Sequence, residues 1–105
     1  MLYLTEERSV GLPQMKEFRT LVASPVGLHA RPASLFSRCA KESGCTVSLA
    51  KISEGVISEF VDGASILRVM TLGVKCGDEI VVQVEGQTED ATASALKTLA
   101  ESTDH

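Results

Sequence analysis

The sequence predicts one α+β domain, in which a four-stranded antiparallel sheet carries three helices on one of its faces. Two observations lead to this fold class. Stretches with alternating apolar residues are interspersed with stretches whose apolar residues recur every three or four positions, in the order βαββαβα. The short link between two strands is a hairpin, which requires antiparallel neighbours and excludes a doubly wound parallel sheet. A chain of 105 residues is long enough for one such domain with a modest core.

Alternation and turn residues define the first strand and the first helix. Phe18, Thr20 and Val22 share one side of an extended stretch, as in a half-buried strand. The SPVG that follows is typical of a turn, because proline fixes φ and glycine is free to take a positive φ. Apolar residues then recur at helical spacing over 30–43, with Pro32 tolerated in the first turn of that helix.

The remaining elements follow from the same two patterns. Gly44 is expected to end the first helix, because a glycine accepts the left-handed conformation common after a last turn. Ser65 and Thr88 are suited to begin the next two helices, since their hydroxyls can accept hydrogen bonds from free amides of the first turn. The elements predicted after Gly44 are a hairpin of strands at 46–52 and 56–61, a short helix within 65–73, a strand at 79–85, and a helix after Thr88.

The N-terminal residues show no clean period. Residues 1–15 include Gly11 and Pro13, so we expect a flexible extension there and a folded domain over 16–105.

Composition narrows the class of protein. The chain is 44% hydrophobic and 23% charged, which is typical of a globular domain, and its net charge of −4 argues against a general nucleic-acid binder. No apolar stretch approaches the roughly 20 residues that span a bilayer. Three cysteines without CxxC spacing indicate neither a disulfide framework nor a metal site. We therefore expect a cytoplasmic, monomeric protein that binds no membrane, nucleic acid or metal.

His29 is the candidate functional residue, because it lies at the predicted start of the first helix. A helix N-terminus presents unpaired N–H groups and a partial positive charge, and so attracts anions. A neutral imidazole there has a free nitrogen that can attack a phosphoryl group. The oxygens of that group would meet the amides of Ala30 and Arg31 and the Arg31 guanidinium. The alternative is a histidine that merely begins a helix, with Arg31 as a solvated side chain.

Two motifs in the chain resemble a known family. GLHARPA at 27–33, and SILRVMTLG followed by GDEI, are similar to the two signature segments of the histidine-containing phosphocarrier (HPr) family of the bacterial phosphoenolpyruvate-dependent sugar phosphotransferase system. The resemblance covers about residues 16–102. It implies the open-faced β-sandwich of that family, which agrees with the order of elements predicted above.

The resemblance also implies a function. His29 would be phosphorylated on Nδ1 by phosphorylated Enzyme I and would pass the phosphoryl group to the A component of a sugar-specific Enzyme II, with Arg31 stabilising the phosphate. Such a protein is a phosphorylated intermediate rather than a free-standing enzyme, and it needs no cofactor. The residues at the family's docking positions are Leu35, Arg38, Ile66, Leu67, Met70 and Thr71.

Ser65 has two possible roles. It can simply cap the short second helix. In many Gram-positive relatives the matching serine is phosphorylated by a dedicated kinase, so the resemblance also implies a regulatory site that a serine kinase and a catabolite-control transcription factor would recognise. The added charge would repel an acidic partner at the docking surface.

Two departures from the family's pattern bear on pathway. Val26 stands where many relatives carry a polar residue, so one side-chain contact to the phosphoryl group is missing. The stretch between the motifs is several residues longer than in common members, which predicts a longer hairpin away from His29. The alternatives to the sugar branch are a carrier dedicated to a nitrogen-branch or dihydroxyacetone-kinase relay, and a regulatory module acting through phosphorylated Ser65.

Overall fold

The computed structural model describes residues 15–103, which form five strands and three helices in a two-layer α+β fold. In chain order the elements are β1 (Met15–Leu21), α1 (Ala30–Ser43), β2 (Thr46–Ser53), β3 (Val56–Ile57), β4 (Val61–Asp62), α2 (Ile66–Thr71), β5 (Glu79–Glu85) and α3 (Glu89–Glu101). The extension predicted for residues 1–15 lies outside the described residues apart from Met15, where β1 begins.

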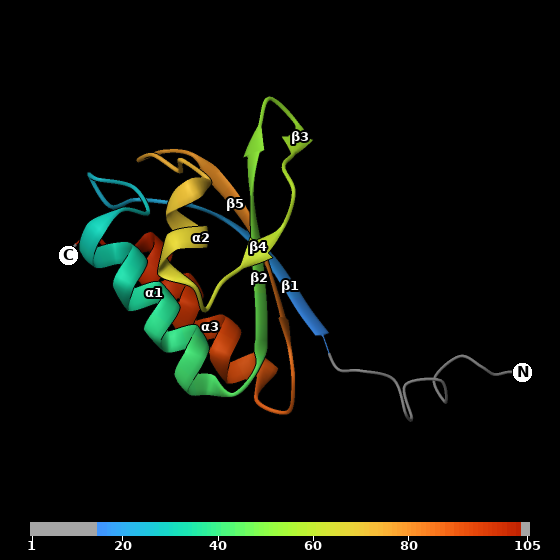
Figure 1. The fold of residues 1–105 in the computed structure, drawn as a ribbon. Coiled ribbons are helices and arrows are strands. Elements are labelled where there is room, and N and C mark those ends of the chain that lie inside the picture. Colours follow the sequence, from blue (N-terminus) through green and yellow to red (C-terminus); the bar gives the residue numbers. More distant parts are fainter. Residues whose placement is uncertain (1–14, 104–105) are drawn as a thin grey trace, which may run out of the picture.

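All strand pairs are antiparallel, and the sheet has the order β1-β5-β2-β3, with β4 also paired to β2. The three helices cover one face of the sheet (Figure 1). The predicted fold class is therefore confirmed. None of the helices within 15–103 combines the length and apolar character needed to cross a bilayer.

The second arm of the predicted hairpin differs from the expectation of one strand over 56–61. It is split into β3 and β4, because the register changes between them: Ile52 pairs with Ile57, whereas Leu49 pairs with Val61. Residues 50–51 of β2 thus face residues 58–60 on the other arm, three against two, as in a bulge. The tip of this hairpin projects past the helices at the top of Figure 1.

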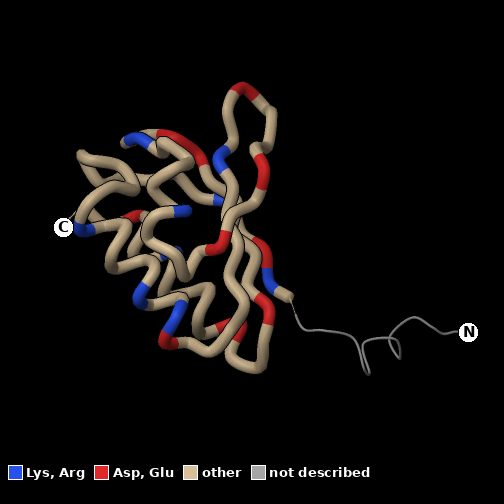
Figure 2. The backbone as a smooth tube through the Cα atoms, in the orientation of Figure 1, with Lys and Arg blue, Asp and Glu red and all other residues tan. Residues whose placement is uncertain are grey.

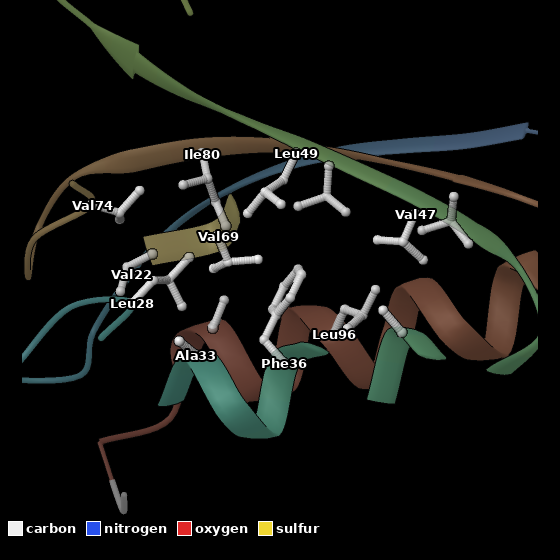
Figure 3. Close-up of a cluster of buried hydrophobic side chains, with 14 of the residues drawn as sticks. Val22, Leu28, Ala33, Phe36, Val47, Leu49, Val69, Val74, Ile80 and Leu96 are labelled. Atoms are coloured by element: carbon white, nitrogen blue, oxygen red, sulfur yellow. The ribbon is translucent and has the colours of Figure 1, made fainter. Parts of the chain in front are cut away.

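The core lies between the sheet and the helices, with Phe36 of α1 near its centre (Figure 3). Ile80, Val82 and Val84 of β5 all point into it, as their alternation predicts. Val81 points to the opposite face and is still buried, in a small second cluster with Ala50 and Ile52. The open face of the sheet therefore has an apolar centre of its own.

The helix ends follow the predicted signals with one difference. Gly44 ends α1 in the left-handed conformation, at φ 75°, and its N–H donates to the Lys41 carbonyl. Thr88 precedes α3, but its hydroxyl does not cap the helix. It lies instead 3.3 Å from Cys45 Sγ and 3.3 Å from Thr92 Oγ1. The hydrogen bond between Thr88 and Cys45 lowers the pKa of the Cys45 thiol. A hydroxyl engaged by neighbouring side chains is not free to accept from the first turn.

Candidate functional site

His29 lies at the N-cap of α1 and is exposed, as are the next two residues. Leu28 before it is only 2% exposed, and Pro32 and Ala33 after it are buried. The short exposed segment is therefore anchored in the core at both ends. Its imidazole makes no hydrogen bond to any residue of 15–103, so the ring is available to a partner.

The backbone around His29 offers two amides to an anion. The first helical bond runs from the Ala33 N–H to the His29 carbonyl, at 3.5 Å. The N–H groups of Ala30 and Arg31 have no acceptor within residues 15–103, and Pro32 has no N–H. Unpaired amides at the positive end of a helix form an anion site. The predicted amide pair is thus present beside the imidazole.

Ala30 holds an unusual backbone conformation, with φ at 50°. An alanine in the left-handed region is strained, at a cost on the order of 1–3 kcal/mol that the surrounding packing must offset. The strained residue directly follows His29. Such residues cluster at functional sites, because local strain is tolerated where geometry serves binding or reaction.

The segment before His29 is held by the turn that precedes β5. The Leu28 N–H donates to the Val74 carbonyl at 3.1 Å. Gly27 has φ 68°, and a Cβ added there would lie 2.1 Å from the same carbonyl oxygen. Glycine is therefore required at this position by both conformation and space. The contacts of Gly27 and Leu28 with the Val74 carbonyl therefore fix the position of the backbone directly before His29.

Lys51 of β2 joins the two ends of that turn. Its Nζ donates to the Gly73 carbonyl at 3.2 Å and lies 3.4 Å from Asp78 Oδ2. The Lys75 N–H donates to the same carboxylate oxygen at 2.8 Å. This hydrogen bond, with the charge of Lys51, holds the pKa of Asp78 below its ordinary value. We call Lys51 and Asp78 the turn clamp.

Sequence reasoning missed the turn clamp, although one signal was present. In the alternation of β2, position 51 falls on the same side as Val47 and Leu49, which are core residues. A lysine at an inward position of a strand needs a buried or half-buried partner. Asp78 carries no such signal, because it lies in a turn where an aspartate is ordinary.

The predicted docking residues are distributed over two helices. Leu67 of α2 is 76% exposed and Ile66 is 43% exposed, while Met70 packs partly against the core. Thr71 is exposed and its hydroxyl donates to the Arg68 carbonyl. Arg38 of α1 is exposed, whereas Leu35 is half-buried in the groove between α1 and α3. The structure brings the α2 members together, whereas Leu35 lines the groove between α1 and α3, which Arg38 also borders.

Ser65 is the N-cap of α2, as predicted. Its Oγ accepts a hydrogen bond from the Arg68 N–H at 3.4 Å, and the residue is half-buried. Asp62 precedes it, and its Oδ1 accepts from the Ala64 N–H at 3.0 Å. Both interactions shape the entry to α2.

The charges of the molecule are unevenly placed, although the chain is acidic overall. Helices α1 and α2 carry four basic side chains and one acidic one, as the blue segments in Figure 2 indicate. The hairpin arm from β2 to β4 carries acidic residues on the other side. Residues 15–103 contain no group of three or more His, Cys, Asp or Glu side chains that could hold a metal ion.

An exposed histidine beside two free amides, on a small α+β domain, is an arrangement suited to carrying an anionic group. The family model described as the PTS HPr component phosphorylation site matches residues 16–102. The chain is 39% identical over 85 residues to the phosphocarrier protein HPr of Streptomyces coelicolor, covering 81% of this chain and 87% of that protein. It is 36% identical over 89 residues to that of Mycoplasma pneumoniae, covering 83% and 94%.

Structural comparison agrees with the sequence. The crystal structure of HPr from Bacillus anthracis superposes with a TM-score of 0.73 at 29% identity, covering 82% of this chain and 96% of that one. The chain belongs to the HPr family of phosphocarriers of the phosphotransferase system. Its role is therefore that of a phosphocarrier, as the two sequence motifs indicated.

Proposed function

We propose that His29 is the residue that carries the phosphoryl group, received from phosphorylated Enzyme I and delivered to the A component of an Enzyme II. The observation that supports this most directly is the exposed imidazole beside the free N–H groups of Ala30 and Arg31. No other histidine lies in the described part of the chain.

The transfer needs little machinery from this protein. His29 Nδ1 attacks phosphorus, and the new N–P bond forms as the bond between phosphorus and the donor breaks. Phosphoryl transfer proceeds mainly by positioning and charge stabilisation. The amides of Ala30 and Arg31 and the exposed Arg31 guanidinium are placed to bind the oxygens of the transferred group. Val26 contributes no side-chain polar group, so the backbone carries this task.

Docking is proposed for the surface beside His29. Its apolar members are Ile66 and Leu67, and its basic members include Arg38. A basic surface on an acidic chain favours encounter with partners that are acidic at their docking site. Met70 and Thr71 support the same surface, while Leu35 would join it only at the edge formed by α1.

The test is the intact mass of the protein after incubation with Enzyme I and phosphoenolpyruvate. We expect one phosphoryl group, lost after brief acid treatment, and none on His29→Ala. His105→Ala is the matched control, because it removes the other histidine of the chain. Uptake by His29→Ala, with a spectrum showing the native fold, would contradict the assignment.

The same assay separates the pathway alternatives. Charging by the sugar-system Enzyme I supports the general carrier, whereas charging only by a nitrogen-branch donor or a dihydroxyacetone-kinase donor assigns a dedicated relay. Each donor is tested alone against the same chain, and a known HPr protein serves as the control for activity of the donor.

We also propose that Ser65 is a regulatory phosphorylation site. Its half-exposed hydroxyl at the start of α2 supports this, because a phosphate at a helix N-terminus is tolerated while its charge changes the docking surface. Incubation with an HPr serine kinase and ATP is expected to add an acid-stable phosphoryl group, absent from Ser65→Ala. A phosphorylated Ser65→Ala would contradict the site.

A further inference from the structure

A pocket of about 250 Å³ lies between α1 and the start of α2; it shares Arg38 and Ile66 with the proposed docking surface but does not include His29, Ala30 or Arg31. Its lining residues are Ser34, Ser37, Arg38, Lys41, Ala64 and Ile66. Four of these six side chains are polar, and all four come from consecutive turns of α1. The polar wall thus belongs to one rigid element.

The polar wall contains a buried hydroxyl without a partner. Ser37 is 3% exposed, and its Oγ has no hydrogen-bond partner within the described residues 15–103. Buried polar atoms are paired in almost all folded proteins, and an exception indicates a missing water, ion or ligand. Ser34 adds a second hydroxyl to the same wall. Ser34 is only half-buried, so its hydroxyl can donate to an oxygen atom in the pocket, whereas the fully buried Ser37 Oγ can do so only after its side chain rotates.

The charges around the pocket are positive. Arg38 and Lys41 line it, and neither forms an ion pair in the part of the chain that the structure describes. No acidic side chain lines it. Glu42 lies instead in the groove between α1 and α3, and the Asp62 carboxylate accepts the hydrogen bond of the Ala64 N–H. The pocket therefore favours an anion.

We propose that this pocket binds a phosphate monoester. A phosphate group has three terminal oxygens, enough to engage the Arg38 guanidinium, the Lys41 ammonium and a serine hydroxyl together. A carboxylate has only two oxygens for the same donors. The volume is below the 300–1,000 Å³ usual for larger ligands and therefore fits a small ester better than a nucleotide.

The phosphate has two possible sources that share this chemistry. One is a small phosphorylated metabolite free in solution. The other is a phosphoryl group on Ser65, whose two neighbours Ala64 and Ile66 line the pocket, and this source depends on the Ser65 phosphorylation proposed above. In the second case the pocket would hold the modified serine against α1.

The first arm of the test uses the His29→Ala chain, which cannot be phosphorylated at position 29, and any binding at the Ala30 and Arg31 amides is recognised by separate shifts at residues 30–31. Its ¹H–¹⁵N amide spectrum is titrated with glycerol 2-phosphate at constant ionic strength. We expect saturable shifts at residues 34–41 and 64–66, and their loss in the additional double variant Arg38→Met/Lys41→Met. Lys16→Met/Lys97→Met is the matched control, because it removes two half-exposed lysines elsewhere and should retain the shifts.

Ser37→Ala tests whether the unpaired Ser37 hydroxyl contributes to ligand binding. We expect affinity for glycerol 2-phosphate to fall about fivefold to tenfold, the usual effect of one hydrogen bond to a charged group. The smaller side chain introduces no clash, and an unchanged spectrum without ligand shows that the fold is kept.

The second arm uses the chain carrying phosphoserine at position 65. If the modified serine fills the pocket, amides at 37–41 shift on phosphorylation, and glycerol 2-phosphate then produces no further change. If free esters are the ligand, the phosphorylated chain still binds glycerol 2-phosphate. Either result supports a phosphate pocket. The proposal is overturned if neither arm produces shifts that Arg38→Met/Lys41→Met removes.

Phosphoryl uptake at His29 is measured separately, on the chain with His29 intact. Failure of both arms with normal uptake overturns the pocket alone. A failed uptake with a normal titration overturns the carrier assignment of His29 alone.

Discussion

At the scale of single residues, the position of His29 depends on one glycine. Gly27 combines a positive φ with close contact to the Val74 carbonyl, so two separate demands exclude a side chain. Gly44 has a similar φ of 75° but has nothing within 4 Å of an added Cβ. Comparing substitutions at Gly27 and Gly44 therefore separates the free-energy cost of a positive φ from that of a steric clash.

Gly27→Ala is expected to lower the free energy of unfolding by about 2–3 kcal/mol, because a Cβ at 2.1 Å from a backbone oxygen forces the turn apart. Gly44→Ala should lower it by only about 1 kcal/mol, for the conformational cost alone. Urea unfolding monitored by circular dichroism measures both. Equal effects of the two substitutions would show that the contact with Val74 does not hold the turn.

At the scale of elements, the turn clamp makes part of the stability depend on pH. The Asp78 carboxylate has a lowered pKa in the folded protein, so its contribution is present above the ordinary value of 3.8 and is lost as the pH falls through the folded pKa. Asp78→Asn should cost about 1 kcal/mol at pH 7, since its carboxylate is 30% exposed and partly screened. The difference from the native chain should shrink below pH 3.8.

Urea midpoints of the native chain and Asp78→Asn between pH 2 and pH 7 measure this dependence. Asp90→Asn is the control, because Asp90 forms a surface pair with Lys16 and its side chain is 80% exposed. A constant difference between the native chain and Asp78→Asn over the whole range would contradict an ionised clamp.

Helix α2 offers a direct test of docking. Leu67 is 76% exposed and contributes little to the core, so Leu67→Glu should change the free energy of unfolding by less than about 0.5 kcal/mol. At a docking centre the same change should raise the apparent KM for the acceptor protein about tenfold. Val56→Glu is the matched control, since Val56 is 68% exposed but lies on the hairpin. Equal transfer kinetics for both variants would remove α2 from the proposed surface.

Local signals were sufficient for some elements and not for others. Helix α1 could be predicted at both ends, because Pro32 favours a first turn and Gly44 provides a left-handed stop. The break between β3 and β4 could not be predicted, because it arises from a one-residue change of register against β2, which no local pattern reports. The partnership of Lys51 with Asp78 is likewise a contact between distant segments.

The site shows the same division between local and distant information. His29, Ala30 and Arg31 are adjacent in sequence, so their grouping at a helix start could be predicted directly. The strain at Ala30 and the support from Val74 depend on how two loops meet, and neither has a composition signal. The docking role of Leu35 stays a prediction; the residue lines the groove between α1 and α3, and no local pattern reports which neighbouring helix a helix face meets.

At the scale of the whole molecule, one core connects the sheet to the helix that begins at His29. Phe36 is fully buried, and Phe36→Ala should lower the free energy of unfolding by about 3–5 kcal/mol, a large part of what a small domain has. Phe60→Ala is the control, because Phe60 is 39% exposed and should cost about 1 kcal/mol or less. Thermal unfolding of both variants distinguishes them, and similar losses would contradict the central place of Phe36.

The exposure of His29 has a consequence for timing. His29 is exposed among the described residues 15–103, so on the proposed assignment a phosphoryl group on its ring would be in contact with water between one partner and the next. The time available for delivery would then be set by the rate at which phosphohistidine hydrolyses in water. Diffusion of the protein to its next partner would have to be faster than this hydrolysis. The basic side chains of α1 and α2 shorten the search, because charge attraction raises the rate of encounter with acidic surfaces.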